Sequence, residues 1–350
     1  MSADNVVAPG AGQACGAGPA GRLLIEVSAP FRLDYVAWAL RRRAHNEVDR
    51  FEDGCWRRVL WLAGEPTDIT VRQDAVAGAQ SLIAELRGPA GSAGRADAAA
   101  VRPVLERMLG LRADLAGFYR VAAGDPRLNA LALRFCGMRP PCFPTVFEAA
   151  VNAVACQQLS LDVGVHLLNR LARRCGPAVP GPVTRYGFPA PDQLADADPA
   201  ELRALGFSMA KARTITAIAG QVAAGDLNLE ALRDADDDQV MSILLGLPGI
   251  GRWSAEYVML RGLARYHVLP GDDVGARNNL RRRFGLPADA GYDAVARLSR
   301  RWWPYGGLVY FHLLLDALAA RRAREFRMAA EHAEFVAAKA SRPRRSQGCR

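Results

Sequence analysis

The sequence has very little lysine and is basic almost entirely through arginine. Of its 45 basic residues, only Lys211 and Lys339 are lysines. Any reaction that passes through a Schiff base is therefore restricted to these two candidates. The formal net charge of +9 favours a polyanionic partner. The abundance of arginine, alanine and glycine is also typical of a GC-rich coding bias, so the charge alone identifies no partner.

The cysteines show no pattern of metal ligands or of a disulfide framework. Their number is odd and none forms a CxxC pair, which favours free thiols in a reducing compartment. The cysteine spacing that would hold an iron–sulfur cluster is missing, and the histidines are scattered. We therefore expect no iron–sulfur cluster. The cysteines are Cys15, Cys55, Cys136, Cys142, Cys156, Cys175 and Cys349.

Hydrophobic runs long enough for a membrane helix are missing too. No uninterrupted apolar stretch reaches about 18 residues. Residues 1–21 lack the basic and apolar regions of a secretory signal. We therefore expect a cytoplasmic protein with no membrane partner.

Composition and periodicity divide the chain into four parts. Residues 1–20 are rich in glycine and alanine and predict a disordered tail. Residues 21–115 predict a mixed α/β domain, and residues 116–325, with apolar side chains at helical spacing, predict an all-α domain. Residues 326–350 are expected to form a basic C-terminal tail. The fold class is therefore α+β. The N-terminal elements expected are strands at Leu23–Val27, Cys55–Leu62 and Thr67–Val71 and a helix at Asp34–Arg43.

A glycine-rich string lies between two predicted helices, Gln239–Leu245 and Ser254–Leu263. It reads Leu-Pro-Gly-Ile-Gly over Leu247–Gly251. Its glycines permit a tight turn and the close approach of a ligand, and Ile250 can anchor the turn in a core. The free amides of the turn and of the following helix are suited to one phosphate group and read no base. A helix C-cap glycine is the alternative that a lone Gly-x-Gly would favour.

Other segments complete a pattern around this hairpin. Asp273 stands twenty residues after Trp253, in a loop led by Leu269-Pro270-Gly271. With Phe147–Ser160, Gly206–Arg213 and Arg301–Tyr305, these segments resemble the helix-hairpin-helix (HhH-GPD) superfamily of DNA glycosylases over residues 20–320. The chain is most similar to the alkyl-base branch, the DNA-3-methyladenine glycosylase II type. The resemblance implies a helical glycosylase domain, a cleft between the domains, and a partner that is double-stranded DNA carrying damaged bases.

The resemblance implies a reaction as well. A damaged base is rotated out of the duplex, and water cleaves its N-glycosidic bond, releasing bases of the 3-methyladenine and 7-methylguanine type and leaving an abasic site. Asp273 then stabilises the positive charge on the sugar and orients the water, a role compatible with capping the helix from Val274. Asp272 is the competing candidate. Bifunctional relatives carry a lysine where this chain has Trp253, so we expect a monofunctional enzyme that needs no cofactor for catalysis and acts as a monomer.

The base pocket is expected to contain Trp253, Tyr257 and Leu314. The two aromatic side chains are four residues apart on one helix face and could attract a cationic methylated base. Tyr257 is equally compatible with a place in the core. Leu314 departs from the family pattern, which has an aromatic residue there.

The remaining expected contacts are with the DNA backbone and with the gap left by the extruded base. At the gap, either Gln158 or Leu159 is the wedge, and hydrogen bonding within the turn is an alternative role for Gln157 and Gln158. The resemblance also implies a structural monovalent cation held by the backbone carbonyls of Leu245, Leu247 and Ile250. The expected DNA-binding residues are Gly249, Ile250, Gly251, Arg252, Ser254, Gln157, Gln158 and Leu159.

Two other functions remain open from the sequence. A DNA-binding protein could keep the hairpin and lack the reaction, although Asp273 at its expected spacing argues against this. A glycosylase for oxidised guanine is the second alternative, and the absence of a lysine at the hairpin weakens it.

Overall fold

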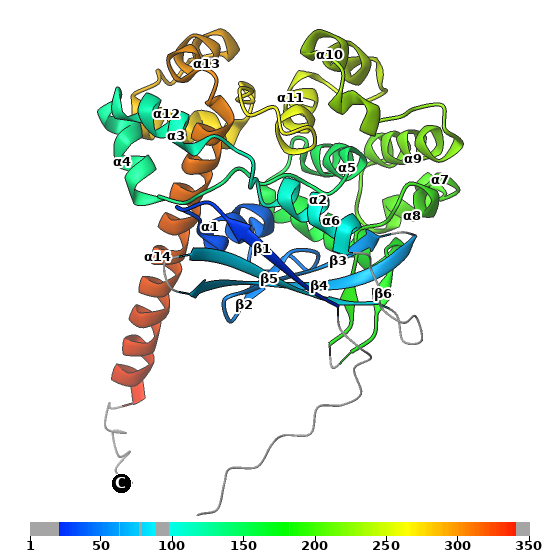
Figure 1. Cartoon of the computed structure of the whole chain (residues 1–350), viewed down its shortest axis with the longest axis horizontal. Helices are drawn as coiled ribbons and strands as arrows, with labels where there is room; N and C mark the ends of the chain where they lie inside the picture. The colour runs from blue at the N-terminus through cyan, green and yellow to red at the C-terminus, as the bar shows by residue number, and fades with distance from the viewer. Residues whose placement is uncertain (1–20, 63, 77–78, 89–97, 182, 341–350) are drawn as a thin grey trace, which may run out of the picture.

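The computed structural model describes residues 21–340, apart from residues 63, 77–78, 89–97 and 182 (Figure 1). The expected tail at 1–20, residues 89–97 after the sheet, and the last ten residues lie outside the described residues. Within the described part, no helix is both long and apolar enough to cross a membrane.

An antiparallel five-stranded sheet forms the N-terminal part, in the order β1-β5-β4-β3-β2. Alternation places Leu23, Ile25 and Val27 of β1 in the core and leaves Leu24 exposed. Helices α1 and α2 lie on the side of the sheet that faces the helical body (Figure 1). The sequence predicted β1, β3 and the centre of β4, but not β2 or β5. The elements are β1 (Gly21–Val27), α1 (Leu33–Arg41), β2 (Arg50–Glu52), β3 (Cys55–Leu62), β4 (Glu65–Val76), β5 (Ala79–Arg87) and α2 (Ala98–Met108).

Helices dominate the rest of the chain. They are α3 (Leu115–Ala123), α4 (Pro126–Arg134), α5 (Val146–Cys156), α6 (Leu161–Cys175), α7 (Asp192–Ala195), α8 (Pro199–Ala204), α9 (Met209–Ala224), α10 (Asp237–Gly246), α11 (Arg252–Arg261), α12 (Val274–Phe284), α13 (Tyr292–Ser299) and α14 (Gly306–Ala340). A short hairpin of β6 (Ala178–Val179) and β7 (Arg185–Tyr186) packs against the main sheet.

Side-chain caps set where several helices begin. Thr145, Ser160, Ser208, Asp236 and Asp273 each accept a hydrogen bond from the backbone N–H three residues later. The cap at Ser160 is one reason why the apolar stripe from Val146 to Cys175 forms two helices, α5 and α6, separated by a turn.

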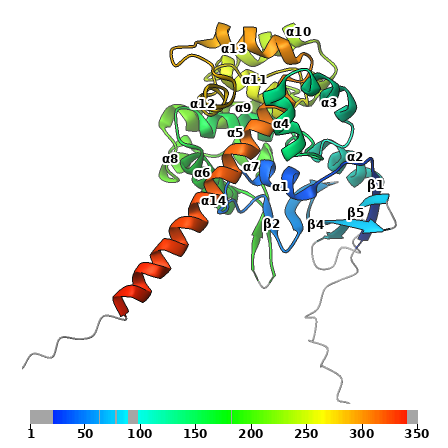
Figure 2. The ribbon, with the colours of Figure 1, turned by 90° about the vertical axis from the view of Figure 1, so that its left-hand side faces the viewer.

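The last helix is longer than the sequence suggested. α14 continues to Ala340, through residues expected to belong to a C-terminal tail starting at 326. Figures 1 and 2 show its C-terminal half leaving the body of the molecule.

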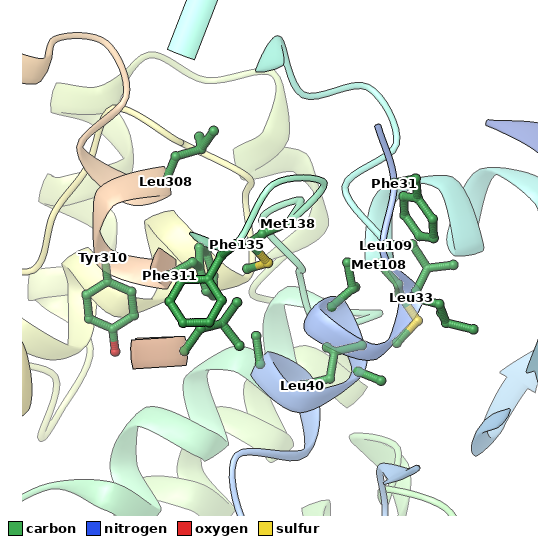
Figure 3. Close-up of a cluster of buried hydrophobic side chains, with 14 of the residues drawn as sticks. Phe31, Leu33, Leu40, Met108, Leu109, Phe135, Met138, Leu308, Tyr310 and Phe311 are labelled. Atoms are coloured by element: carbon green, nitrogen blue, oxygen red, sulfur yellow. The ribbon is translucent and has the colours of Figure 1, made fainter. Parts of the chain in front are cut away.

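Two hydrophobic cores hold the molecule together, and they do not follow the expected domain boundary near residue 115. The first core joins the sheet and α1–α4 to α12–α14. Figure 3 shows part of it, where Phe31 and Leu40 lie in the same cluster as Phe135 and Phe311. The second core is formed mainly by α5–α11. The C-terminal helices therefore pack with the N-terminal sheet, and the segment between them in sequence forms the other half.

A buried ion-pair network links the sheet to α5. Arg58 of β3 contacts the Asp49 carboxylate at 2.8 Å and the Glu148 carboxylate at 2.5 Å, and all three side chains are almost completely buried. Burial raises the pKa of Glu148, and the charge of Arg58 opposes that rise. One guanidinium thus compensates two carboxylates in a place that water does not reach.

Replacing Arg58 by methionine should strongly destabilise the protein. The substitution leaves two carboxylates buried without their cation, which typically costs about 3–5 kcal/mol. The loss should shrink at acidic pH, where Glu148 takes up a proton. Chemical denaturation of R58M against wild type measures both effects. R112M is the matched control, because Arg112 pairs with Glu106 while remaining 82% exposed, and it should change the free energy of unfolding little.

Candidate functional site

A cleft of about 1040 Å³ lies where the two cores meet. One wall comes from the turn after α5 and from the α10–α11 hairpin, which belong to the second core. The other comes from the start of α12 and from α14, which belong to the first. The cleft contains most of the site residues predicted from the sequence.

Asp273 lies in this cleft at the N-terminus of α12. Its Oδ1 accepts a hydrogen bond from the Ala276 N–H at 2.7 Å, and its Oδ2 accepts one from Trp253 Nε1 at 3.1 Å. The N-terminus of α12 favours the ionised carboxylate. In the structure, burial raises the pKa of Asp273 and is the largest effect, while hydrogen bonds from Ala276 and Trp253 oppose it.

The carboxylate of the neighbouring residue, Asp272, is paired with two arginines. Asp272 contacts Arg252 at 2.8 Å and also pairs with Arg277. For Asp273, the described residues provide hydrogen-bond donors and no salt bridge. Of the two candidates, Asp273 is therefore the one whose negative charge is still available to a cationic group in the cleft.

The hairpin between α10 and α11 has the expected form. Gly249 adopts a φ of +77°, and Ile250 is buried, as an anchor requires. A Cβ at Gly249 would lie 2.3 Å from Thr214 Oγ1, whereas a Cβ at Gly251 would meet open space. Gly251 is the N-cap of α11 and no side chain caps that helix. The first N–H groups of α11 are thus left for a ligand.

The turn after α5 is fastened to the hairpin. Gln157 Nε2 donates to the Gly249 carbonyl at 2.9 Å and to Ser254 Oγ at 2.8 Å. Gln157 therefore has a hydrogen-bonding role, but its partners lie in the hairpin and not within its own turn. The Ser254 side chain is buried and engaged in this internal contact, and the expected DNA contact of Ser254 at the helix N-terminus stays a prediction. Arg252 is half-exposed at the mouth, paired with Asp272.

Gln158 and Leu159 project at the tip of the same turn. Gln158 has a φ of +52°, and both residues are exposed beside the cleft. Lys211 Nζ, from α9, donates to the carbonyls of Ala155 and Gln157 at 3.1 and 2.6 Å, which holds the base of the turn in place. Which of the two exposed residues is the wedge stays a prediction.

The three predicted pocket residues line the cleft together. Trp253 and Tyr257 have ring centroids 5.5 Å apart, and Leu314 faces the same space from α14. Tyr257 is also buried, so it belongs to the second core as well as to the lining of the cleft, and its contact with a base stays a prediction. At the predicted cation site, the Leu247 carbonyl accepts a hydrogen bond from the Ile250 N–H at 3.1 Å. A cation held by the carbonyls of Leu245, Leu247 and Ile250 stays a prediction.

Sequence reasoning missed several residues that complete the site. Glu256 is buried and accepts hydrogen bonds from the Gly271 N–H at 3.0 Å and from the Tyr292 hydroxyl at 2.6 Å, so it positions the loop before Asp273. Burial raises its pKa. Tyr310, Arg42 and Arg261 also line the cleft. No local pattern marks these residues, because their partners are far away in the sequence.

The comparisons with known proteins agree with this geometry. Residues 151–305 match the family model of the HhH-GPD superfamily base excision DNA repair protein, and that segment contains both the hairpin and Asp273. Over this segment the chain is similar to this superfamily.

Individual proteins that are similar to the chain are named as DNA repair enzymes or DNA glycosylases. The chain is 30% identical to the probable bifunctional transcriptional activator/DNA repair enzyme AlkA of Mycobacterium tuberculosis, over 83% of this chain and 56% of that protein. It is 31% identical to DNA-3-methyladenine glycosylase 2 of Escherichia coli, over 51% and 60% respectively. It thus spans little more than half the length of these relatives. The structure of the 3-methyladenine DNA-glycosylase from Archaeoglobus fulgidus superposes with a TM-score of 0.74 at 26% identity, covering 84% of this chain and 97% of that one.

The two hairpin glycines should respond differently to substitution by alanine. G249A forces a side chain into the left-handed region and against Thr214, so it should lower the free energy of unfolding by about 1 kcal/mol or more. G251A should cost clearly less than G249A, since its Cβ meets nothing and only the preference for glycine over alanine at the N-cap is lost. Thermal unfolding of both variants tests this, and equal stability of the two would contradict the proposed turn geometry.

Proposed function

We propose that the protein is a monofunctional DNA glycosylase that extrudes and hydrolytically releases alkylated bases, of the 3-methyladenine and 7-methylguanine type, from duplex DNA. The observation that carries the proposal is the Asp273 carboxylate, which lies in the cleft beside the hairpin and is held by N–H donors without a cation of its own. The names of the relatives from Escherichia coli and Archaeoglobus fulgidus support the alkyl-base class.

The proposed reaction uses that uncompensated charge. When the bond between base and deoxyribose breaks, its electron pair leaves with the base and positive charge develops on the sugar. A carboxylate already fixed by Ala276 and Trp253 needs little reorganisation to oppose that charge. Each carboxylate oxygen can accept a further hydrogen bond, so Asp273 can also orient the attacking water.

Water is the proposed nucleophile because the hairpin offers no amine. Trp253 stands at the hairpin position beside Asp273. Lys211 is engaged with two backbone carbonyls below the turn after α5, and it is not among the residues that line the cleft. A Schiff base with the sugar is therefore not available to it, and the product is an abasic site in an intact strand.

The duplex is proposed to bind across the mouth of the cleft. The uncapped N-terminus of α11 and the Gly249–Gly251 turn supply N–H donors for one phosphate. The exposed Gln158 and Leu159 lie on the turn that Gln157 fastens to this hairpin, on the same wall of the cleft, where they can occupy the space of an extruded base.

Replacing Asp273 by asparagine should abolish base release while leaving DNA binding largely intact. Asparagine preserves the helix cap but has no charge to oppose the sugar cation, so the rate should fall about a hundredfold or more. The measurement is single-turnover release of methylated bases from duplex DNA, with abasic sites and strand nicks assayed separately. D236N, the same change at the cap of α10, should retain full activity. Undiminished release by D273N would refute the assignment.

The pH dependence of base release should report the environment of Asp273. Protonation removes the required charge, and because burial raises the pKa of Asp273, activity should fall on the acidic side at a pH above that at which an exposed aspartate titrates. W253F removes a hydrogen-bond donor to the ionised carboxylate, so its acidic limb should move to higher pH. W61F is the control, because Trp61 Nε1 donates to the Phe188 carbonyl and Trp61 does not line the cleft. A W253F limb at the wild-type position would contradict this account.

A further inference from the structure

A buried arginine lines the inner part of the cleft. Arg42 directly follows α1, has a φ of +59° and is only 5% exposed, yet it borders the cleft together with Cys156 and Tyr257. Among the described residues, it forms no salt bridge with a carboxylate. A cationic side chain in such a place is costly unless it is compensated or used.

The guanidinium is fixed in place by two neutral acceptors. Its Nη1 donates to the Tyr257 hydroxyl at 3.1 Å and its Nη2 to Asn152 Oδ1 at 2.7 Å. Its Nε, although buried, has no hydrogen-bond partner among the described residues. Arginine only donates hydrogen bonds, so Arg42 gives this part of the cleft a fixed donor character with N–H capacity left over.

The charges around Arg42 strengthen this character. Arg261 is also buried in the lining of the cleft and lies over the Tyr257 ring, 5.6 Å from its centroid. Behind them, Arg58 is shared between the carboxylates of Asp49 and Glu148. Arg42 thus has a second guanidinium beside the same tyrosine, and among the described residues no carboxylate is paired with it. The Tyr257 face is already in contact with a cation, so it is a poorer partner for a cationic base than the sequence suggested.

We propose that Arg42 determines base specificity by donating a hydrogen bond to an exocyclic carbonyl of the extruded base. The proposal rests on the glycosylase function proposed above and adds a selection within its substrates. A guanine-derived base presents the O6 acceptor, whereas an adenine-derived base presents an amino group in the same position. An amino group and the guanidinium are both hydrogen-bond donors, so no hydrogen bond forms between them. The cleft therefore favours carbonyl-bearing lesions over amino-bearing ones.

Methylated duplex DNA provides a direct test, because it contains 7-methylguanine and 3-methyladenine together. Both bases are cationic, so the repulsion by the arginines largely cancels in the ratio of their release rates, and the carbonyl contact remains. R42M removes the donors and keeps an unbranched side chain. The ratio of 7-methylguanine to 3-methyladenine released should fall roughly tenfold or more relative to wild type. R42K, which keeps a charge but loses the planar fork, should lower the ratio several-fold.

The control is R139M, the same substitution at another buried arginine. Arg139 donates to the backbone carbonyls of Leu111, Ala113 and Ser28 and does not line the cleft. The ratio of 7-methylguanine to 3-methyladenine released by R139M should equal that of wild type, even if R139M is less stable. If R42M does not fold, R42K alone provides the test.

The outcomes separate this proposal from the one on which it rests. A wild-type protein that releases neither base refutes the glycosylase function. A wild-type protein that releases both, in a ratio that folded R42M or R42K leaves unchanged, overturns the role of Arg42 alone.

Discussion

The site depends on a carboxylate that is held by hydrogen-bond donors while its neighbour holds the cations. Asp272 takes up Arg252 and Arg277, and Asp273 is left with N–H groups from α12 and Trp253. The donors oppose the effect of burial on the pKa of Asp273 without cancelling its charge. A salt bridge at Asp273 would also have fixed the carboxylate, but it would have removed the field on which the proposed reaction depends.

Holding Asp273 in that state involves both halves of the molecule. The helix that it caps packs in the core shared with the sheet, while Trp253 and Glu256 belong to α11, whose packing lies mainly in the second core. Glu256 fixes the Gly271 N–H just ahead of Asp273. The cleft therefore exists because the chain leaves the first core after α4, builds the second, and returns through α12. A movement of one core against the other would change the hydrogen bond between Trp253 and Asp273, whereas the bond from Ala276 lies within the cap of α12.

The sequence predicted the parts of the site that are local and missed those that are assembled over distance. The hairpin turn, the cap at Asp273 and the breaks between helices follow from glycine, capping and spacing, which operate over a few residues. The contacts of Gln157 with Ser254, of Lys211 with Ala155 and of Arg42 with Asn152 join residues 56 to 110 positions apart. A single sequence carries no signal for such pairs. For the same reason, β5, which inserts between β1 and β4, could not be placed, and the return of α12–α14 to the first core was missed.

The lining of the cleft contains side chains of opposite charge, and under the proposed function these would orient a substrate. Asp273 is suited to a group that gains positive charge, and the region around Arg42 and Arg261 is suited to one that gains negative charge. Cleavage of a glycosidic bond produces these two changes at once, on the sugar and on the base. A neutral base leaves with an electron pair that a carbonyl group can accommodate, and a donor such as Arg42 stabilises that charge. A cationic base becomes neutral as it leaves and gains little from the donor. The same arginine that selects a carbonyl at binding would then also assist departure, so its contribution should be largest for neutral carbonyl-bearing lesions.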